Sequence, residues 1–508
     1  MRNNKKNIVA ISVTLVILTI SIFGTGCKKD FLDRKPLGQY TTDNYPYGTG
    51  SGPYDQYIFA AYASLRTWQT SVFGYIGAVS IRSDDADKGS TPSDASTQIE
   101  MDNFPVTPTN SLTNDLWTGY YATITDCNII LNQVAKDSSH TPEATKLLAR
   151  GEARFLRGYS YFMLVRLFGN VPLVDTVLAN VSASNISQST PAEVYAFIEN
   201  DLQFAAATLP LKWDAKFIGR ATSGAANGML AKVYLYEKKW QQAMTTAGMV
   251  ISSGVYNLNT PYDKIFTEDG ENSSGSIFEI QAYADANHQE DSYGCQYANV
   301  QGVRGSGQFN LGWGFNVPSQ ELVDAYEPGD PRENSTILFC PSTGPTEYGE
   351  VFPAEPNPRY NKKVYTNPAV RNAVGDQFGW WTNIRILRYS DVLLMYAEAA
   401  NEVGGQTDEA LAKLEMVRAR ARNGDNTILP PVTTTDQSQL RDAIRHERRI
   451  ELAMEGERFF DLVRWGIADS VLHAAGKTNF DGTRDDLLPI PQTQIDLSKG
   501  VLKQNPGY

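Results

Sequence analysis

The sequence predicts a mainly α-helical protein in which imperfect helix pairs form a scaffold around a loop-rich segment. Apolar residues recur at the spacing of amphipathic helices through most of residues 53–254 and again from about residue 389 to residue 465. Small residues recur where two neighbouring helices would touch. Residues 255–389 are instead crowded with Gly, Asn, Ser, Pro, Tyr and Trp, which predicts loops, small helices and a few short strands.

The 508 residues could fill one large domain or several small ones, and we expect a single domain over residues 53–508. It should comprise an N-terminal helical part (residues 53–254), a loop-rich insert (residues 255–389) and a C-terminal helical part (residues 390–508). In the N-terminal part, helices are expected over residues 112–134, 143–168, 192–207, 223–236 and 240–251.

The expected helix pairs have the residue spacing of tetratricopeptide repeats, in which small residues let two helices approach. The first copy has intervals of 3, 9, 4 and 3 residues, and the second keeps the 4 and 3 intervals with an extra residue between helices. We therefore expect a tetratricopeptide-like helical-repeat scaffold. The positions are Ala231, Tyr234, Ala243, Ala247 and Val250 in the first copy, and Ala397, Ala410, Leu414 and Val417 in the second.

The N-terminus has the pattern of an export signal. Cations at positions 2, 5 and 6 precede an apolar run over residues 8–23, shorter than the roughly 20 residues that span a bilayer. The run ends in small residues directly before Cys27, which resembles a bacterial lipoprotein signal. Residues 1–26 should then be removed, Cys27 acylated, and residues 27–52 left as a lipidated tether that holds the protein on a membrane. The alternative is an ordinary secretory signal with Cys27 as a free thiol.

Charge and composition argue against several classes of protein. The formal net charge is −12 and becomes −15 without the three cations of the signal, so no nucleic-acid-binding surface is expected. Four cysteines and four histidines are too few for a disulfide scaffold or a His-rich metal site. Cys127, Cys295 and Cys340 fit no metal-ligand spacing and should be buried or free. We expect neither a metal nor a cofactor.

Two segments rich in rings or charges are interpreted as structural. Residues 153–174 place Phe155, Tyr159 and Phe162 around one helix, and rings at helical spacing are typical of a core rather than a ligand groove. In residues 445–466, carboxylates at four-residue intervals would repel one another unless arginines lie between them. The segment lacks the second histidine of an HExxH zinc motif, so we expect an ion-pair network rather than a catalytic or metal site.

Asp84, Asp85 and Asp87 gather three carboxylates in a short polar segment. Such a cluster could bind calcium, hydrogen-bond a ligand or cap a helix, but calcium would need further oxygen ligands. Paired carboxylates also raise a glycosidase hypothesis, which requires two carboxyl groups about 5 to 10 Å apart across the scissile bond. The sequence alone does not provide that distance.

Large rings in the insert are the strongest sign of a binding site. Trp313 and Phe315 stand in a Gly-Trp-Gly-Phe sequence, and Trp380 and Trp381 follow Gly379. A sugar ring offers an apolar C–H face and a polar rim, which an aromatic plate beside Asn or Asp groups can satisfy. The alternative is that these tryptophans anchor a long loop to the body.

Several separated stretches together resemble the SusD/RagB family of outer-membrane glycan-binding lipoproteins. They follow one another in a single order from the proposed anchor to the C-terminus. The stretches are CKKDFLD from Cys27, SDDADKG, ARFLRGYSYFMLVRLFGNVPLV, GRA leading into AKVYLY, ILRYSDVLLMYAEAANE, RHERRIELAMEGERFFDLVRWG and LLPIPQ.

The resemblance implies about four tetratricopeptide-like helix pairs that support a loop-rich binding face. It also implies a surface-exposed lipoprotein of the outer membrane that delivers oligosaccharides to a SusC-like TonB-dependent transporter, and members bind rather than cleave. The starch-binding member carries a tryptophan soon after its acidic stretch, where this chain has Asp87, Lys88 and Gly89. Starch is therefore not inherited as the ligand, and Trp313 is the one aromatic position carried over.

The leading hypothesis is a non-catalytic protein that binds an oligosaccharide or polysaccharide at the cell surface. Trp313, Phe315 and Trp380 are the candidate stacking plates, and Asp84 and Asp85 are the candidate polar contacts. The alternatives are a glycoside hydrolase with paired carboxylates and a structural lid of the transporter without glycan affinity of its own.

Overall fold

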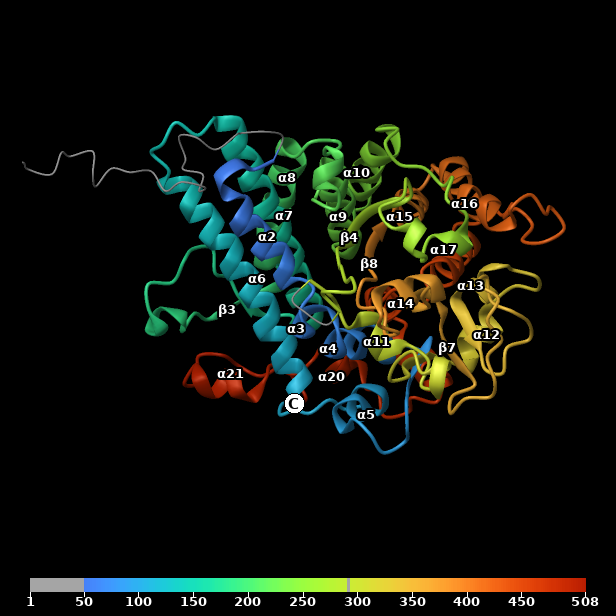
Figure 1. Cartoon of the computed structure of the whole chain (residues 1–508). Coiled ribbons are helices and arrows are strands. Elements are labelled where there is room, and N and C mark those ends of the chain that lie inside the picture. Colours follow the sequence, from blue (N-terminus) through green and yellow to red (C-terminus); the bar gives the residue numbers. More distant parts are fainter. Residues whose placement is uncertain (1–49, 290–292) are drawn as a thin grey trace, which may run out of the picture. The chain divides into compact units, whose positions relative to one another are not determined.

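The computed structural model describes residues 50–289 and 293–508, and all of these except the loop 138–141 belong to one compact unit. Its longer helices lie side by side in a row (Figure 1). The row consists of α2 (Asp55–Ser64), α6 (Ser111–Lys136), α7 (Glu143–Phe168), α8 (Pro191–Thr208), α9 (Ser223–Tyr236), α10 (Trp240–Ser252), α15 (Tyr389–Val403) and α16 (Thr407–Arg422).

The order of the helices in the row follows the order of the chain. α2 contacts α6, and from α6 to α10 each helix contacts the next one. α15 packs directly on α10 although residues 253–388 separate them, so the loop-rich insert leaves the row and returns without interrupting it. α17 (Gln437–Glu451) then packs on α15 and α16. The mainly α-helical fold class is confirmed.

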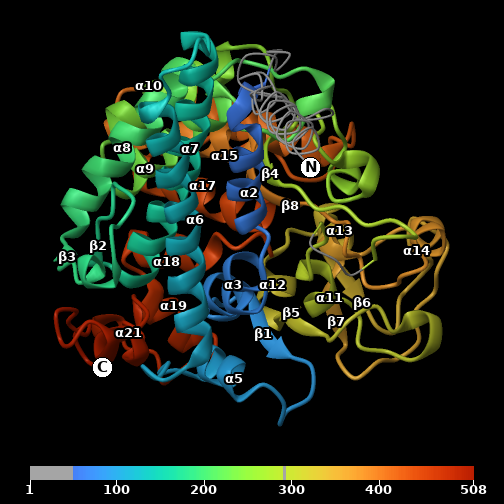
Figure 2. The ribbon, with the colours of Figure 1, turned by 60° about the vertical axis from the view of Figure 1, so that its left-hand side comes forward.

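Shorter elements complete the fold, and those from α11 to α14 lie on one side of the row, the side of β1, while β4 and β8 lie against the row itself (Figure 2). The short helices are α3 (Trp68–Ser71), α4 (Phe73–Ile76), α5 (Ser96–Asn103), α11 (Tyr297–Gln301), α12 (Gln320–Ala325), α13 (Arg332–Thr336), α14 (Pro368–Val374), α18 (Arg458–Trp465), α19 (Ala468–Ala474), α20 (Gly482–Asp485) and α21 (Gln492–Leu497). The strands are β1 (Ala86–Gly89), β2 (Val171–Pro172), β3 (Gln188–Ser189), β4 (Ser276–Ile280), β5 (Phe315–Pro318), β6 (Ile337–Phe339), β7 (Arg359–Asn361) and β8 (Ile384–Arg388).

The strands of the described residues form antiparallel pairs, and two of these pairs position the insert. β4 follows α10 and β8 leads into α15, and their pairing closes the base of the insert. β1, from the N-terminal part, pairs with β5 of the insert, with Gly89 opposite Phe315. The second pairing matters for function because it brings the acidic stretch at residues 84–87 next to the aromatic stretch at residues 313–315.

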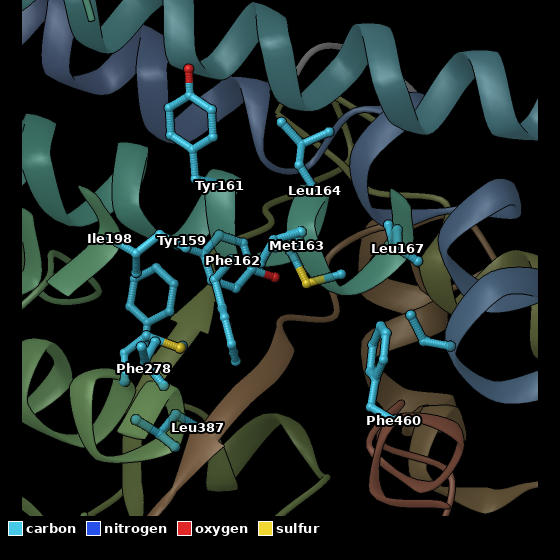
Figure 3. Close-up of a cluster of buried hydrophobic side chains, with 14 of the residues drawn as sticks. Tyr159, Tyr161, Phe162, Met163, Leu164, Leu167, Ile198, Phe278, Leu387 and Phe460 are labelled. Carbon is cyan, nitrogen blue, oxygen red and sulfur yellow. The ribbon is translucent and has the colours of Figure 1, made fainter. Parts of the chain in front are cut away.

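α7 lies at the centre of the core, as its ring pattern predicts. Phe155, Tyr159, Phe162 and Phe168 are all buried, and Figure 3 shows Tyr159 and Phe162 within this cluster of buried side chains. The ring of Phe155 packs edge-on against Phe278 of β4, with 4.8 Å between the ring centroids. These rings are core packing, and the ligand-groove alternative for this segment is wrong.

The small residues that define the predicted repeat spacing lie between helices. Ala231 on α9 and Ala243 and Ala247 on α10 are fully buried where the two helices pack, and so are Ala397 on α15 and Ala410 on α16. A small side chain at each position lets the helix axes approach closely. The packing is therefore as expected, while the tetratricopeptide repeat itself stays a prediction.

The carboxylates of α17 are bridged by arginines from distant elements, which confirms the predicted ion-pair network. Glu447 accepts hydrogen bonds from Arg332 of α13 and from Arg418 of α16, the latter at 3.0 Å. Glu451, one turn further on, accepts from Arg388 of β8 at 2.8 Å. All five side chains are buried, so the network ties the insert to the end of the helical row.

Cys127, Cys295 and Cys340 are buried free thiols, as expected from their spacing. Cys27, the predicted signal over residues 1–26 and residues 27–49 of the predicted tether lie outside the described residues, whereas the last three residues of that tether, 50–52, are buried in the fold. Within the described ranges, no helix combines the length and the apolarity needed to cross a membrane. The predicted division into helical parts and insert stays a prediction.

Candidate functional site

Four rings from three segments meet where β5 begins. The Trp313 ring lies 5.9 Å from Trp68 and 6.4 Å from Phe73, measured between centroids, and Phe73 packs edge-on against Phe315 at 5.0 Å. Trp313 is 39% exposed, Trp68 and Phe73 are half-buried, and Phe315 is buried beneath them. We call these four residues the ring cluster. It presents a partly exposed tryptophan on a base of packed aromatic side chains.

The backbone holds Trp313 in place from both sides. The Trp313 N–H donates to the carbonyl of Asn299 at 2.9 Å, and the Gly314 N–H donates to the carbonyl of Gly302 at 2.9 Å. Gly314 has a φ of +74°, and a Cβ there would lie 2.8 Å from the Cβ of Arg304, so glycine is required. The ring is thus held on a turn that is hydrogen-bonded to α11 and its C-terminal end, which suits a surface that must bind without rearrangement.

Asp84 and Asp85 are placed differently from the prediction. They are only 3% and 1% exposed, and arginines of α17 and α18 form ion pairs with their carboxylates. Arg458 binds both oxygens of Asp84 at 2.8 Å, and Arg449 binds Asp85 at 2.7 Å. Burial raises the pKa of Asp85, whereas for Asp84 the hydrogen bonds and charges of the arginines outweigh burial and lower the pKa. Direct ligand contact by this pair does not fit, because a ligand would have to displace buried ion pairs.

Phe315 and Trp380 are not the exposed stacking surfaces that the sequence predicts. Phe315 lies under Phe73 and is 4% exposed, so it supports the surface rather than forming it. Trp380 is half-buried and packs beside Val374 and Trp381 in a separate cluster. Among the described residues, no ring contact joins Trp380 to the ring cluster. Trp381 is buried and donates its indole N–H to Glu268 at 3.1 Å, which is the loop-anchoring role considered as the alternative.

A polar rim borders the ring cluster on the side of Gly314. Asp94 accepts a hydrogen bond from Ser90 at 2.7 Å and ion pairs from Lys88 at 3.0 Å and Arg304 at 2.8 Å. Lys88 also lies 5.6 Å over the Phe315 ring, which links this rim to the aromatic base. The arrangement places partly exposed donors and acceptors next to an exposed tryptophan.

The Asp94→Asn variant should lose stability in a pH-dependent way. Slight burial favours the neutral carboxyl, but hydrogen bonds from Ser90 and Lys88 lower the pKa of Asp94 to about 2. Because the folded pKa is depressed, this contribution is present above about pH 4 and is lost as the pH falls toward 2. The carboxylate is partly exposed, so we expect a loss under about 1 kcal/mol at pH 7. Urea unfolding between pH 7 and pH 2.5 measures it. If the free energies of unfolding of wild type and variant differed by a constant amount over this pH range, the lowered pKa of Asp94 would be contradicted.

A second exposed aromatic group lies on the insert before α11 and was not found by the sequence analysis. Tyr283 and Tyr293 are exposed, and the Tyr283 N–H donates to the carbonyl of Tyr293 at 2.9 Å. The Tyr283 hydroxyl donates to Asp285 at 2.7 Å, and His288 packs edge-on against Tyr293 at 5.7 Å. The reasoning applied to Trp313, rings within a polar stretch, could have found this group. Trp68 and Phe73 carry no such signal, because nothing local distinguishes them from core rings.

Comparisons with known proteins identify two matching family models. The model described as "SusD family" matches residues 360–508, and "Starch-binding associating with outer membrane" matches residues 76–235. Trp313 and the exposed tyrosines lie between these ranges. The matched ranges therefore cover much of both helical parts, but they leave out most of the rings that are candidates for ligand contact.

Relatives and solved structures align over most of the chain. "SusD-like protein P2" of Formosa agariphila is 28% identical over 98% of this chain and 99% of its own, and "Starch-binding protein SusD" of Bacteroides thetaiotaomicron is 24% identical over 76% of each. A structure titled "Laminarin binding SusD-like protein" is 30% identical, covers 89% of this chain and 98% of its own, and has a TM-score of 0.74. "Surface glycan-binding protein A" of Bacteroides thetaiotaomicron in complex with laminarihexaose is 26% identical, with the same coverages and a TM-score of 0.75.

Proposed function

The chain belongs to the SusD/RagB family, and from that premise we propose that it binds an oligosaccharide without cleaving it and delivers it to a TonB-dependent outer-membrane transporter. The observation that carries the proposal is the ring cluster: a partly exposed tryptophan, held rigidly beside half-buried Trp68 and Phe73, with hydrogen-bonding groups at its edge. Solved relatives with this fold include one whose title names laminarin and one in complex with laminarihexaose.

The ring cluster suits a sugar chain in its chemistry. The face of Trp313 can stack on the apolar C–H face of a pyranose, while Asp94 and Arg304 can hydrogen-bond the hydroxyls at its rim. Each such contact contributes little, and contacts repeated along a chain reinforce one another. We therefore propose oligosaccharides rather than monosaccharides as ligands, with Tyr283 and Tyr293 as further stacking surfaces on the insert.

The placement of the carboxylates favours binding over hydrolysis. A glycosidase needs two carboxyl groups free to act as acid and as base or nucleophile on either side of the scissile bond. Asp84 and Asp85 are buried and committed to Arg449 and Arg458, and Asp94 is paired with Lys88 and Arg304. These three carboxylates thus serve structural ion pairs, which supports a non-catalytic role.

The proposed location is the outer face of the outer membrane, with acylated Cys27 as the anchor. One matching family model is described as associating with the outer membrane. In this proposal the protein captures a glycan at the cell surface and releases it into the transporter to which it is docked.

Calorimetry with a panel of neutral hexasaccharides tests the proposal. Laminarihexaose should be titrated first because solved relatives bind such glycans, followed by maltohexaose, cellohexaose and glucose. We expect at least one hexasaccharide to bind, glucose to bind more weakly, and no new reducing ends after prolonged incubation. Release of reducing ends would identify a hydrolase. Failure of a broad glycan panel to bind, in a protein that still co-purifies with the transporter, would identify a structural lid.

A further inference from the structure

A buried glutamine joins the segments that carry the ring cluster. Gln301, the last residue of α11, is 0% exposed, so it does not itself contact a ligand. Its side-chain carbonyl accepts two hydrogen bonds, from the amide of Asn316 in β5 at 2.6 Å and from the amide of Asn361 in β7 at 2.8 Å. Its own amide donates to the carbonyl of Tyr297, one turn earlier on α11, at 3.0 Å. A single buried side chain therefore fastens two strands of the insert to α11.

α11 also carries the turn that presents Trp313. The carbonyl of Asn299 on this helix accepts the Trp313 N–H at 2.9 Å. The two backbones are in close contact, because a Cβ on Gly302 would lie 2.2 Å from the carbonyl oxygen of Leu311, and a Cβ on Gly312 would lie 2.2 Å from that of Asn299. Since no side chain fits between them, a displacement of α11 would move the turn and its tryptophan as well.

Asn316 has a backbone conformation that its surroundings must hold. Its φ is +57°, in the left-handed region that residues other than glycine rarely adopt, although asparagine does so more readily than most. Such conformations persist only where neighbouring contacts fix them, and they gather at functional sites. Asn316 directly follows Phe315, the buried base of the ring cluster, so its hydrogen bond to Gln301 stabilises an unusual backbone conformation immediately behind the cluster.

We propose that Gln301 is a positioning residue of the ring cluster. Its side-chain carbonyl holds β5 and β7 on α11 and so fixes the orientation in which the Trp313 ring meets a sugar. Stacking depends on the angle between the two rings, and a binding group is held in a productive orientation by the residues behind it. The inference rests on the proposed function and deepens it, because it assigns part of the glycan affinity to a side chain that no ligand reaches.

The first test replaces the amide of Gln301 by an apolar group of similar size. Gln301→Met should bind the strongest-binding hexasaccharide about tenfold more weakly than wild type, measured by calorimetry. The matched control is Asn128→Leu, because Asn128 on α6 is also a buried amide that donates, to the carbonyl of Val174 at 2.9 Å, and accepts, from Arg157 at 2.7 Å. These partners lie outside α11, β5 and β7, so the control should keep the wild-type affinity.

Fluorine NMR of fluorotryptophan-labelled protein without ligand reports the position of the ring itself. The signals of Trp313 and Trp465 are assigned by their loss in Trp313→Phe and Trp465→Phe, and Trp465 on α18, bound to Glu398 at 2.9 Å, is the internal reference. In Gln301→Met the Trp313 signal should shift or broaden while the Trp465 signal stays in place. In the Asn128→Leu control both signals should stay. A general loss of stability would not move one tryptophan signal selectively.

A pair of variants at Asn316 keeps the inference testable if Gln301→Met does not fold. Both Asn316→Gly and Asn316→Ala remove the hydrogen bond to Gln301, but glycine adopts a positive φ freely and alanine does not. The alanine variant should therefore bind the hexasaccharide several-fold more weakly than the glycine variant, and its Trp313 signal should move further. Wild-type affinity and an unmoved Trp313 signal in Asn316→Ala would overturn the inference.

Failure of the inference and failure of the proposed function are distinguishable. If Gln301→Met binds the hexasaccharide as wild type does and its Trp313 signal is unchanged, Gln301 does not position the ring, although the proposed function stands. If wild type binds no glycan of the panel, the proposed function fails. The fluorine spectra of Gln301→Met then decide the positioning role alone: a selective change of the Trp313 signal supports it, and an unchanged signal overturns it.

Discussion

Replacing Glu451 by leucine is expected to lower the free energy of unfolding by about 3–5 kcal/mol. Glu451 is fully buried and accepts hydrogen bonds from Arg388 at 2.8 Å, Arg420 at 2.5 Å and Arg332 at 3.3 Å. Burial alone would raise its pKa, but the charges of Arg420 and Arg388 hold the pKa well below the ordinary value of a glutamate. Removing this carboxylate takes the paired charge from buried Arg420 and one negative charge from the network, in which Arg388 still pairs with Glu455 and Arg332 with Asp330 and Glu447.

Urea unfolding followed by tryptophan fluorescence measures this effect, with Glu143→Leu as the control. Glu143 also pairs with an arginine, Arg150, at 2.6 Å, but the Glu143 side chain is 64% exposed and that of Arg150 is 33% exposed. Exposed pairs contribute at most about 1 kcal/mol, so the control should unfold nearly as wild type does. Equal losses in the two variants would show that the buried network does not stabilise the junction of α17, β8 and the insert.

The Trp313→Ala variant should bind the best glycan at least tenfold more weakly than wild type, a loss of about 1.4 kcal/mol or more. Trp313 provides the exposed face of the ring cluster, and truncation would also uncover Trp68 and Phe73 beside it. Adding Trp68→Ala should bring the total loss to about a hundredfold, because it removes the neighbouring ring as well. Calorimetry with the strongest-binding hexasaccharide measures both variants.

The control for this prediction is Trp380→Ala, which removes a half-buried tryptophan outside the ring cluster. It should change glycan affinity less than Trp313→Ala does, and Trp313→Phe should recover part of the loss because it restores a stacking face. Circular dichroism and urea unfolding verify that each variant is folded. Unchanged affinity in Trp313→Ala would show that the ring cluster is not the site, although the family assignment would stand.

Much of the scaffold can be predicted from the sequence, because the buried face of a helix depends on residues only a few positions apart. The rings of residues 153–174 follow the 3.6-residue period, and α7 buries them as that period requires. Carboxylates one turn apart on a helix cannot share a buried face without cations between them. Residues 445–466 therefore predict an ion-pair network. In the structure, Arg388 and Arg418 provide two of its cations.

The candidate site was predicted only in part, because exposure and pairing in loops depend on distant segments. Trp313 was identified from its glycine neighbours and is indeed partly exposed, but Phe315, two residues later, is covered by Phe73. Asp85 was expected at the ligand and is instead paired with Arg449, 364 positions away in the chain. No spacing rule in one sequence connects residues at that separation.

Periodicity, and charges placed within one or two turns of helix, are enough to predict the helical scaffold, the buried core and the charge network, whereas the family is predicted from the ordered stretches that resemble it. Which rings face solvent, and which carboxylates are paired with arginines, follows from contacts between segments far apart in the chain. The pairing of β1 with β5 brings the acidic stretch against the aromatic one, and the packing of Trp68 and Phe73 around Trp313 forms the exposed surface. These contacts are fixed by the free energy of the whole packed unit, which no local pattern encodes.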